Sequence, residues 1–144
     1  MSPSQRSSGR SRRSEEKSTA PETISIKIPA SPEYLQVVRL VAAGLASRLS
    51  FTLEDIEDLK IAVDELSAYI TGAHGRSGTL AVSFTLHGDR IQIRGIGEYT
   101  ESYEVRTDLT EFSRMILETV ADSAELSASD GMPAFSLVKS KATR

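Results

Sequence analysis

Glu65 and Tyr69 lie four residues apart in a segment whose apolar residues recur at helical spacing. Residues four apart share one face of an α-helix, so a carboxylate and a phenol are expected side by side. A carboxylate accepts hydrogen bonds, whereas a phenol donates or accepts one and is a poor neutral ligand for magnesium. Because the apolar stripe runs through Val63 and Leu66, Glu65 is expected at its edge, facing the sheet or a cleft. A plain surface carboxylate near the helix end is the alternative.

A second feature is the Gly95-Ile96-Gly97 stretch, which follows an alternating apolar segment. Glycine has no Cβ and lets the backbone approach a ligand closely. Many turns also carry two glycines at this spacing, so a plain hairpin exit explains the stretch equally well. The residue two positions before Gly95 is Ile93, which cannot accept a hydrogen bond from a ligand.

The composition excludes several kinds of site. The chain has no cysteine, which excludes disulfides, thiolate catalysis and cysteine-based metal sites. The two histidines are too few for a zinc site, so no metal site is expected. A net charge of -3 gives no basic excess for nucleic-acid binding. No apolar run approaches the roughly 18–20 residues of a membrane span, and the N-terminus lacks a signal-peptide core, so a cytoplasmic protein is the simplest interpretation.

Two regions differ in composition. Residues 1–22 are rich in Ser and Arg, hold five basic and three acidic residues (5 − 3 = +2), and have almost no apolar residue. Such a segment cannot bury enough surface to offset its ordering entropy, so a disordered tail is predicted. It suits either a solubilising leader or contact with an acidic partner or nucleic acid. Residues 23–140 have the composition of one domain.

The elements that must position Glu65 and Tyr69 follow from periodicity. Alternation predicts strands over 23–28, 80–86, 91–93, 124–128 and 134–138, and helical spacing predicts helices over 32–49, 52–71 and 112–120. Capping boxes are expected at Thr52 with Asp55 and at Asp108 with Glu111. The order β-α-α-β-β-α-β-β predicts an α/β two-layer sandwich, a mostly antiparallel sheet with helices on one face.

The two-helix segment carries a family resemblance. SPEYLQVVRLVAAGLASRLSFTLEDIEDLKIAVDE resembles bacterial, actinobacterial-type anti-sigma factors of the serine-kinase group, which have the histidine-kinase-like ATPase (GHKL, Bergerat) fold. IPASPEYL is similar to the start of the family's first helix, and EDIEDLKIAVDE to the approach to its first nucleotide motif. The resemblance covers residues 23–140 and implies this fold for them.

In that family, a Glu-x-x-x-Asn motif supplies a general base and a magnesium ligand, and an Asp-x-Gly-x-Gly motif reads adenine. Glu65 matches the catalytic Glu, while Tyr69 replaces the Asn. Gly95 and Gly97 match the glycines, while Ile93 replaces the Asp. The glycine-rich stretch over the phosphates has no counterpart in TDLTEFSRMILETV. The resemblance therefore implies a degenerate cofactor site at Glu65, Tyr69, Gly95 and Gly97, where ATP with magnesium is possible but doubtful.

The resemblance also implies partners. Arg39 matches an arginine that contacts the sigma factor and the antagonist in the family, and a solvated arginine is its alternative. The acidic run of residues 54–58 suits either a basic region of a sigma factor or the positive end of its own helix.

The implied function is an anti-sigma factor that sequesters an alternative sigma factor and regulates stress or developmental transcription. A STAS-type anti-anti-sigma factor would antagonise it, and the chain would pair as a homodimer through its first helix. The alternative is an ATP-dependent serine/threonine kinase that phosphorylates the antagonist with Glu65 as base. A scaffold without either activity is a third possibility.

Overall fold

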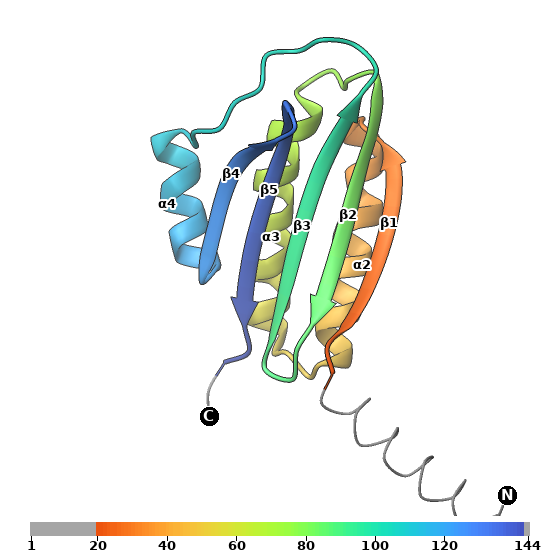
Figure 1. The fold of residues 1–144 in the computed structure, drawn as a ribbon. Helices are drawn as coiled ribbons and strands as arrows, with labels where there is room; N and C mark the ends of the chain where they lie inside the picture. Colours follow the sequence, from red (N-terminus) through yellow and green to blue (C-terminus); the bar gives the residue numbers. More distant parts are fainter. Residues whose placement is uncertain (1–19, 143–144) are drawn as a thin grey trace, which may run out of the picture.

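Three helices cover one face of a five-stranded antiparallel sheet (Figure 1). The computed structural model describes residues 20–142. Along the chain, the elements are β1 (Glu22–Pro29), a 3-10 turn (Pro32–Tyr34), α2 (Leu35–Arg48), α3 (Leu53–Thr71), β2 (Gly78–Leu86), β3 (Arg90–Tyr99), α4 (Glu111–Val120), β4 (Ser123–Ser129) and β5 (Met132–Ser140). The predicted element order and fold class are confirmed.

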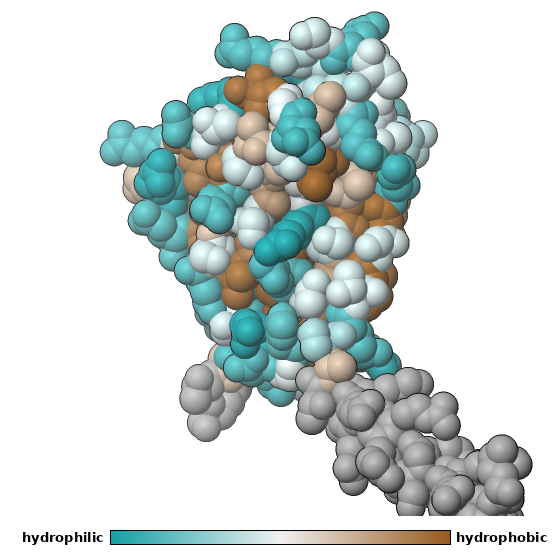
Figure 2. All heavy atoms as spheres, viewed as in Figure 1, coloured by the Kyte–Doolittle hydropathy of each residue, from teal (hydrophilic) through white to brown (hydrophobic). Residues whose placement is uncertain are grey.

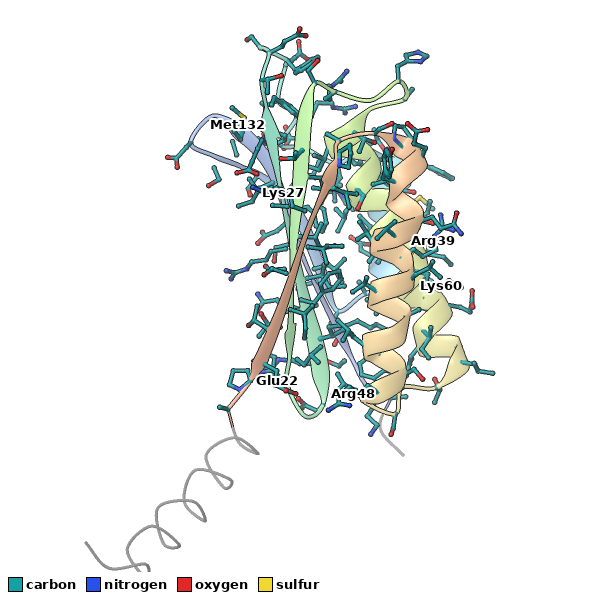
Figure 3. All side chains as sticks on the ribbon, turned by 90° about the vertical axis from the view of Figure 1, so that its right-hand side faces the viewer. Glu22, Lys27, Arg39, Arg48, Lys60 and Met132 are labelled. Atoms are coloured by element: carbon teal, nitrogen blue, oxygen red, sulfur yellow. The ribbon has the colours of Figure 1, made fainter. Side chains whose placement is uncertain are left out.

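Strand alternation places the core between the sheet and the helices. The strand order is β1-β2-β3-β5-β4, and every neighbouring pair is antiparallel. Seen edge-on, the sheet carries α2 and α3 on one side only (Figure 3). Apolar side chains of alternate residues meet there and are fully buried: Leu80, Val82, Phe84, Ile91, Ile93 and Leu137 from the strands, and Val38, Leu59, Val63, Leu66 and Ile70 from the helices. This burial is the main term that stabilises the fold.

Among residues 20–142, no helix lies on the opposite face of the sheet. Small and polar side chains dominate there, for example Ser25, Ala81, Ser83 and Ser136. Figure 2 shows this face as a mosaic of hydrophilic and hydrophobic residues. Within the part of the chain described, no helix has both the length and the apolar character needed to cross a membrane.

The start of α3 agrees with its sequence signal. The Thr52 hydroxyl accepts a hydrogen bond from the Asp55 backbone N–H at 3.1 Å, which satisfies one of the free donors of the first turn. The helix ends at Gly72, whose φ of 65° lies in the left-handed region. The length and direction of α3, and hence the positions of Glu65 and Tyr69, are thereby fixed at both ends.

The start of α4 differs from its predicted signal. Asp108 was expected to cap the helix with Glu111 three residues later, but Thr110 is the N-cap and Glu111 is the first helical residue. The Thr110 hydroxyl accepts from the Ser113 backbone N–H at 3.1 Å, and the Thr110 N–H donates to the Tyr69 hydroxyl at 3.0 Å. The N-cap of α4 is therefore two residues later than predicted, and this cap residue also contacts the distant Tyr69.

Two further boundaries differ from expectation. β3 continues to Tyr99, so Gly95 and Gly97 lie inside a strand and not at a hairpin exit. β1 begins at Glu22, the last residue assigned to the tail. The rest of the predicted tail is residues 1–21, of which 1–19 lie outside the described residues.

Candidate functional site

The C-terminal half of α3 and the first turn of α4 enclose a pocket of about 390 Å³. The polar residues that line it are Glu65, Tyr69, Arg76, Arg106, Thr110 and Ser113. Glu65 and Tyr69 thus lie together, as their spacing of four residues predicted. The volume is within the range of pockets that hold small ligands.

A directed chain of hydrogen bonds crosses the floor of this pocket. The Thr110 backbone N–H donates to the Tyr69 hydroxyl at 3.0 Å, which donates to Ser113 Oγ at 2.7 Å. Ser113 Oγ in turn donates to Glu65 Oε2 at 2.6 Å. An N–H can only donate and an ionised carboxylate can only accept, so the two ends fix the direction of both hydroxyls between them. Glu65 is therefore a hydrogen-bond acceptor for its own chain.

The two arginines of the pocket come from loops that neighbour in space but not in sequence. The Arg106 guanidinium lies 5.4 Å from the centroid of the Tyr69 ring, and that of Arg76 lies 4.7 Å from the centroid of the Tyr103 ring. Both distances allow cation–π contact. Gly72 leaves room for Arg76, since a Cβ at Gly72 would lie 3.0 Å from the guanidinium carbon. The rings of Tyr69 and Tyr103, together with Gly72, which has no Cβ, thus contact the two guanidinium groups.

Neither arginine forms an ion pair with a carboxylate within residues 20–142. Their charges instead act on tyrosines. Partial burial raises the pKa of Tyr69, but the Thr110 N–H that donates to its oxygen and the nearby Arg106 charge favour the phenolate and bring that pKa below its ordinary value. Burial raises the pKa of Tyr99, and the nearby Arg76 opposes this rise. The pocket is electropositive around its phenols.

Gly95 and Gly97 do not line the pocket. A Cβ on Gly95 would lie 2.2 Å from Cε2 of Phe135, and one on Gly97 would lie 2.9 Å from Cγ2 of Ile70. Both glycines face the helices within β3 and make room for core side chains. Ile93, at the position where the resemblance places an adenine-reading Asp, is fully buried in the same core. The structure therefore brings two of the four predicted cofactor residues together and gives the other two a packing role.

The pocket by itself offers few ligands for a magnesium ion. Its one carboxylate, Glu65, accepts from Ser113 through Oε2, and the hydroxyl of Tyr69 is engaged with Thr110 and Ser113. Magnesium at phosphate sites is usually held by one or two carboxylates together with waters and substrate phosphates, so Glu65 is the side chain of this pocket that could contribute. No group of three or more acidic or histidine side chains that could hold a metal ion occurs among residues 20–142.

Arg39 lies on the outer side of the helical layer, away from this pocket. Its Nε donates to Asp64 of α3 at 3.0 Å, and the two side chains remain 37% and 42% exposed. Figure 3 shows Arg39 and Lys60 pointing away from the sheet. Two apolar residues of α2 are also exposed, Val37 at 42% and Leu40 at 60%, and because they are three apart they share one side of the helix. The outer surface of α2 thus carries an arginine and an uncovered apolar strip.

The acidic run at the start of α3 is partly engaged within the chain. Lys139 Nζ lies 3.7 Å from Asp55 and 3.5 Å from Asp58, and Asp55 also accepts from the Ala142 N–H. Glu57 pairs with Lys60 at 3.1 Å. These contacts tie α3 to the end of β5, so the run acts at least partly in the fold.

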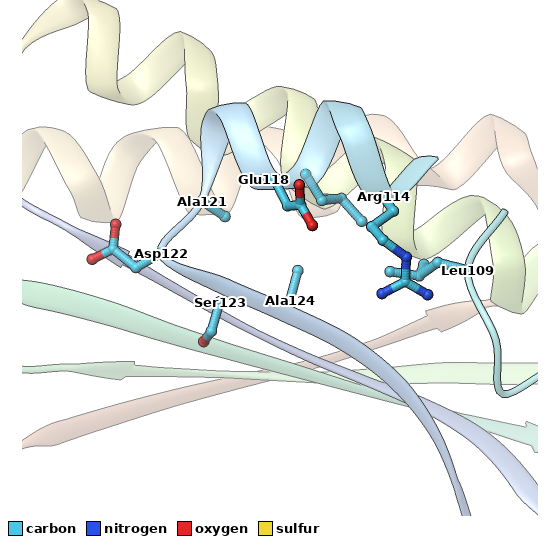
Figure 4. Close-up of a pocket in the computed structure, with 8 residues that line it drawn as sticks. Leu109, Arg114, Glu118, Ala121, Asp122, Ser123 and Ala124 are labelled. Atoms are coloured by element: carbon cyan, nitrogen blue, oxygen red, sulfur yellow. The ribbon is translucent and has the colours of Figure 1, made fainter. Parts of the chain in front are cut away.

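A smaller cavity of about 80 Å³ separates α4 from β4 (Figure 4). Arg114, Glu118 and Asp122 are among the residues that line it. One water occupies about 30 Å³ of liquid, so this space suits a few waters and not a cofactor.

Comparison with known proteins gives the family. No protein-family model matches the chain. The chain is 34% identical over 131 residues to the serine-protein kinase RsbW of Bacillus pumilus, across 76% of this chain and 80% of that protein. It is 30% identical over 129 residues to the serine-protein kinase RsbW of Bacillus subtilis, with the same coverage of 76% and 80%. The chain belongs to the RsbW family.

This membership confirms the resemblance to anti-sigma factors of the serine-kinase group. The structure agrees at the level of the fold. A crystal structure of the RsbU and RsbW domains of a Mycobacterium tuberculosis protein matches with a TM-score of 0.62 at 16% identity, across 85% of this chain and 33% of that one.

Sequence reasoning missed four residues of the pocket in this RsbW-family chain: Arg76, Arg106, Thr110 and Ser113. Thr110 and Ser113 are three apart, which is the spacing of a side-chain cap, so a signal for them existed. Arg76 and Arg106 are in polar loops with no periodicity, and only the tertiary fold brings them together.

Proposed function

We propose that this chain is an anti-sigma factor that sequesters an alternative sigma factor in the cytoplasm and so regulates stress or developmental transcription. The observation that supports this most is the exposed outer surface of α2, which carries both Arg39 and the apolar side chains of Val37 and Leu40. Exposed apolar side chains beside an arginine are typical of protein-binding surfaces. Binding would block the sigma factor from core RNA polymerase by steric occlusion.

The Arg39–Asp64 ion pair suits exchange with a partner. Exposed pairs of this kind contribute little to stability, about 0–1 kcal/mol. A carboxylate of a partner can therefore replace Asp64 at small cost. A STAS-type anti-anti-sigma factor competes for the same surface in this proposal and releases the sigma factor. Pairing of two copies through α2 as a homodimer belongs to the same proposal.

The test is purification of the tagged chain from its native cells, followed by identification of bound proteins. We expect a sigma factor in the wild-type eluate. Arg39→Glu should lose it because the reversed charge repels a partner carboxylate. Arg48→Glu, which makes the same charge reversal at the far end of α2, is the matched control and should retain it. Recovery of neither a sigma factor nor an antagonist by the wild-type chain would refute the proposal.

A homodimer through α2 is tested separately by sedimentation. Leu40→Glu places a charge in the exposed apolar surface and should convert a dimer to a monomer, because burying an unpaired carboxylate is costly. An equal mass for the wild-type chain and Leu40→Glu, whether monomer or dimer, contradicts this part of the proposal.

A second function, ATP-dependent phosphorylation of the antagonist, is favoured by one contact. Glu65 accepts a hydrogen bond from a serine hydroxyl at 2.6 Å, the geometry in which a general base holds the hydroxyl it activates. Here that hydroxyl is the chain's own Ser113. The names of the relatives, serine-protein kinases, make ATP a plausible ligand.

A thermal shift with ATP and magnesium tests this second function. Nucleotide at about 100 times its Kd should add roughly 2.7 kcal/mol of stability. Phosphate transfer to a serine of the antagonist should occur with the wild-type chain and be lost in Glu65→Gln. If nucleotide causes no thermal shift but partner binding is normal, only the binding function remains. If the wild-type chain binds neither nucleotide nor partner, the third possibility, a scaffold, remains.

A further inference from the structure

A shallow trough runs along β2 on the face of the sheet that no helix of residues 20–142 covers. Its floor is formed by the small side chains of Ala81 and Ser83, and its volume is about 450 Å³. Longer side chains from the neighbouring strands form the walls: Lys27 on β1, and Arg94 and Ile96 on β3. Strand register produces this shape, because Lys27 and Ile96 both lie opposite Ala81. The trough is therefore two strand spacings wide, about 10 Å.

A polar bridge closes one end of the trough. Lys27 Nζ lies 2.9 Å from Glu98 Oε1, and the Thr79 hydroxyl donates to the same oxygen at 3.1 Å. These contacts, with Lys27 as the main cause, lower the pKa of Glu98. The carboxylate is therefore ionised at neutral pH, and it matches the charge of Lys27 within the fold.

Arg94 has no such match. It is exposed and forms no ion pair with a carboxylate among residues 20–142. The residues opposite it on the two neighbouring strands are Ser83 and Ser136, whose short side chains leave the guanidinium accessible. Ile96, the next residue of β3 on this face, is 40% exposed. The trough thus presents one unmatched cation and an uncovered apolar side chain.

The shape of the trough favours a helix of another protein as its occupant. Sites for small molecules enclose most of the ligand surface, whereas this trough lies on the surface and would leave one side of a ligand in water. An α-helix with its side chains is about 10–12 Å across, which matches the width of the trough. On the other face of the sheet, α2 and α3 already lie along the strands (Figure 1). A second copy docked trough to trough would bring two Arg94 cations together, which is unfavourable.

We propose that this trough binds an amphipathic helix of a partner protein, whose apolar stripe covers Ile96 and the floor and whose carboxylate pairs with Arg94. Apolar side chains laid on Ala81 and Ser83 are removed from water, and a carboxylate at the edge of the stripe accepts from the guanidinium. This surface goes beyond the sigma-factor contact proposed at Arg39, which lies on the helical side of the sheet (Figure 3). Its failure would leave that contact unaffected.

The experiment measures the binding of two synthetic helical peptides to the full chain by fluorescence anisotropy. Both peptides carry leucines at the i, i+3, i+4 and i+7 positions of a helix, with glutamates beside this stripe in one and lysines in the other. We expect the acidic peptide to bind at least about tenfold more tightly, because only it can pair with Arg94. Unspecific attraction would favour the basic peptide instead, since the net charge of the chain is -3.

Variants locate the bound peptide. Arg94→Gln should weaken binding of the acidic peptide about tenfold, the loss expected for a hydrogen bond to a charged group, and Ile96→Ser about fivefold through lost apolar burial. Arg48→Gln and Phe112→Ser are the matched controls, because they make similar changes at exposed residues of the helical layer. Each should change affinity less than about twofold. A Tm within about 4 °C of the wild-type value shows that a variant folds.

Five results would overturn the inference. The first two are no binding of the acidic peptide up to about 1 mM, and binding no tighter than that of the basic peptide. Equal losses of affinity in Arg94→Gln and Arg48→Gln would indicate only long-range attraction. A loss in Arg39→Gln with none in Arg94→Gln would place the peptide on α2. A mass in sedimentation that is lower for Arg94→Gln than for the wild-type chain, without peptide, would show that a second copy occupies the trough.

Discussion

Replacement of Ser113 by alanine removes the central hydroxyl of the chain that joins α4 to α3. Ser113 is 4% exposed and both accepts from Tyr69 and donates to Glu65. Its loss leaves the Tyr69 hydroxyl without that acceptor and the Glu65 carboxylate without its short bond of 2.6 Å. Stability should fall because these groups lose partners within the fold.

The size of the loss follows from the partners. A hydrogen bond to a charged group contributes about 1.5–3 kcal/mol, and the bond to Tyr69 adds about 0.5–1.5 kcal/mol. Glu65 and Tyr69 are only partly buried, so water can replace part of what is lost. We therefore expect Ser113→Ala to lower the free energy of unfolding by about 1–2 kcal/mol, a decrease in Tm of roughly 4–8 °C.

Urea denaturation of a double-mutant cycle measures the coupling. Tyr69→Phe alone should cost about 1 kcal/mol, since it loses its bonds to Thr110 and Ser113. Because the two hydroxyls belong to one chain, the double variant should cost less than the sum of the single variants by about 0.5–1 kcal/mol. Thr119→Ala is the control. Its hydroxyl is also on α4 but bonds only the Met115 carbonyl, so its change should stay within about 0.5 kcal/mol.

Additivity within about 0.3 kcal/mol would show that Tyr69 and Ser113 do not act through one hydrogen-bond chain. A cost for Ser113→Ala no larger than that for Thr119→Ala would go further. It would mean that the contact between α3 and α4 contributes nothing beyond apolar packing, and the assignment of Glu65 as a structural acceptor would be wrong.

Three other variants follow from the same structure. Gly95→Ala should lose about 2–3 kcal/mol in urea denaturation, because its Cβ would lie 2.2 Å from the buried Phe135 ring. Gly44→Ala, with no atom within 4 Å of the added Cβ on a helix, should gain about 0.5–1 kcal/mol. Arg106→Gln should raise the pKa of Tyr69 in a phenolate absorbance titration. Because the pKa of Tyr69 in the folded state is lowered from about 10, its ionisation adds stability as the pH rises through that lowered pKa, fully so above about 10, and none at neutral pH. An unchanged titration in Arg106→Gln would contradict the effect of the Arg106 charge.

Local sequence signals were sufficient where the hydrogen bond that they predict forms within one turn of a helix. Thr52 was predicted as a cap because a hydroxyl before an acidic first turn satisfies free N–H groups, and the structure confirms it. The same rule failed at α4, where Asp108 and Thr110 are both acceptable caps. A distant hydroxyl, that of Tyr69, bonds the Thr110 N–H, and no periodicity within the segment encodes that contact.

The candidate site divides in the same way. Glu65 and Tyr69 could be paired from a spacing of four residues, because one helix holds both. Gly95 and Gly97 looked alike in sequence whether they lay at a turn, at a ligand or in a core, and only the positions of Phe135 and Ile70 distinguish these cases. Arg106 reaches the pocket through a loop whose path depends on where α4 packs, so its role required the tertiary structure.

The bond from Ser113 to Glu65 bears directly on which function the chain performs. A serine of an antagonist that takes the place of Ser113 at Glu65 Oε2 must displace a residue that also receives the Tyr69 bond and helps close the first turn of α4. Exchanging one serine for another at the carboxylate is nearly neutral, but opening that turn costs the remaining bonds, about 1–2 kcal/mol or roughly tenfold in the competent population. The surface around Arg39 needs no such opening, because it is already exposed. Use of that oxygen as a base would therefore require a rearrangement of α4, whereas partner binding through α2 would use the fold as it stands.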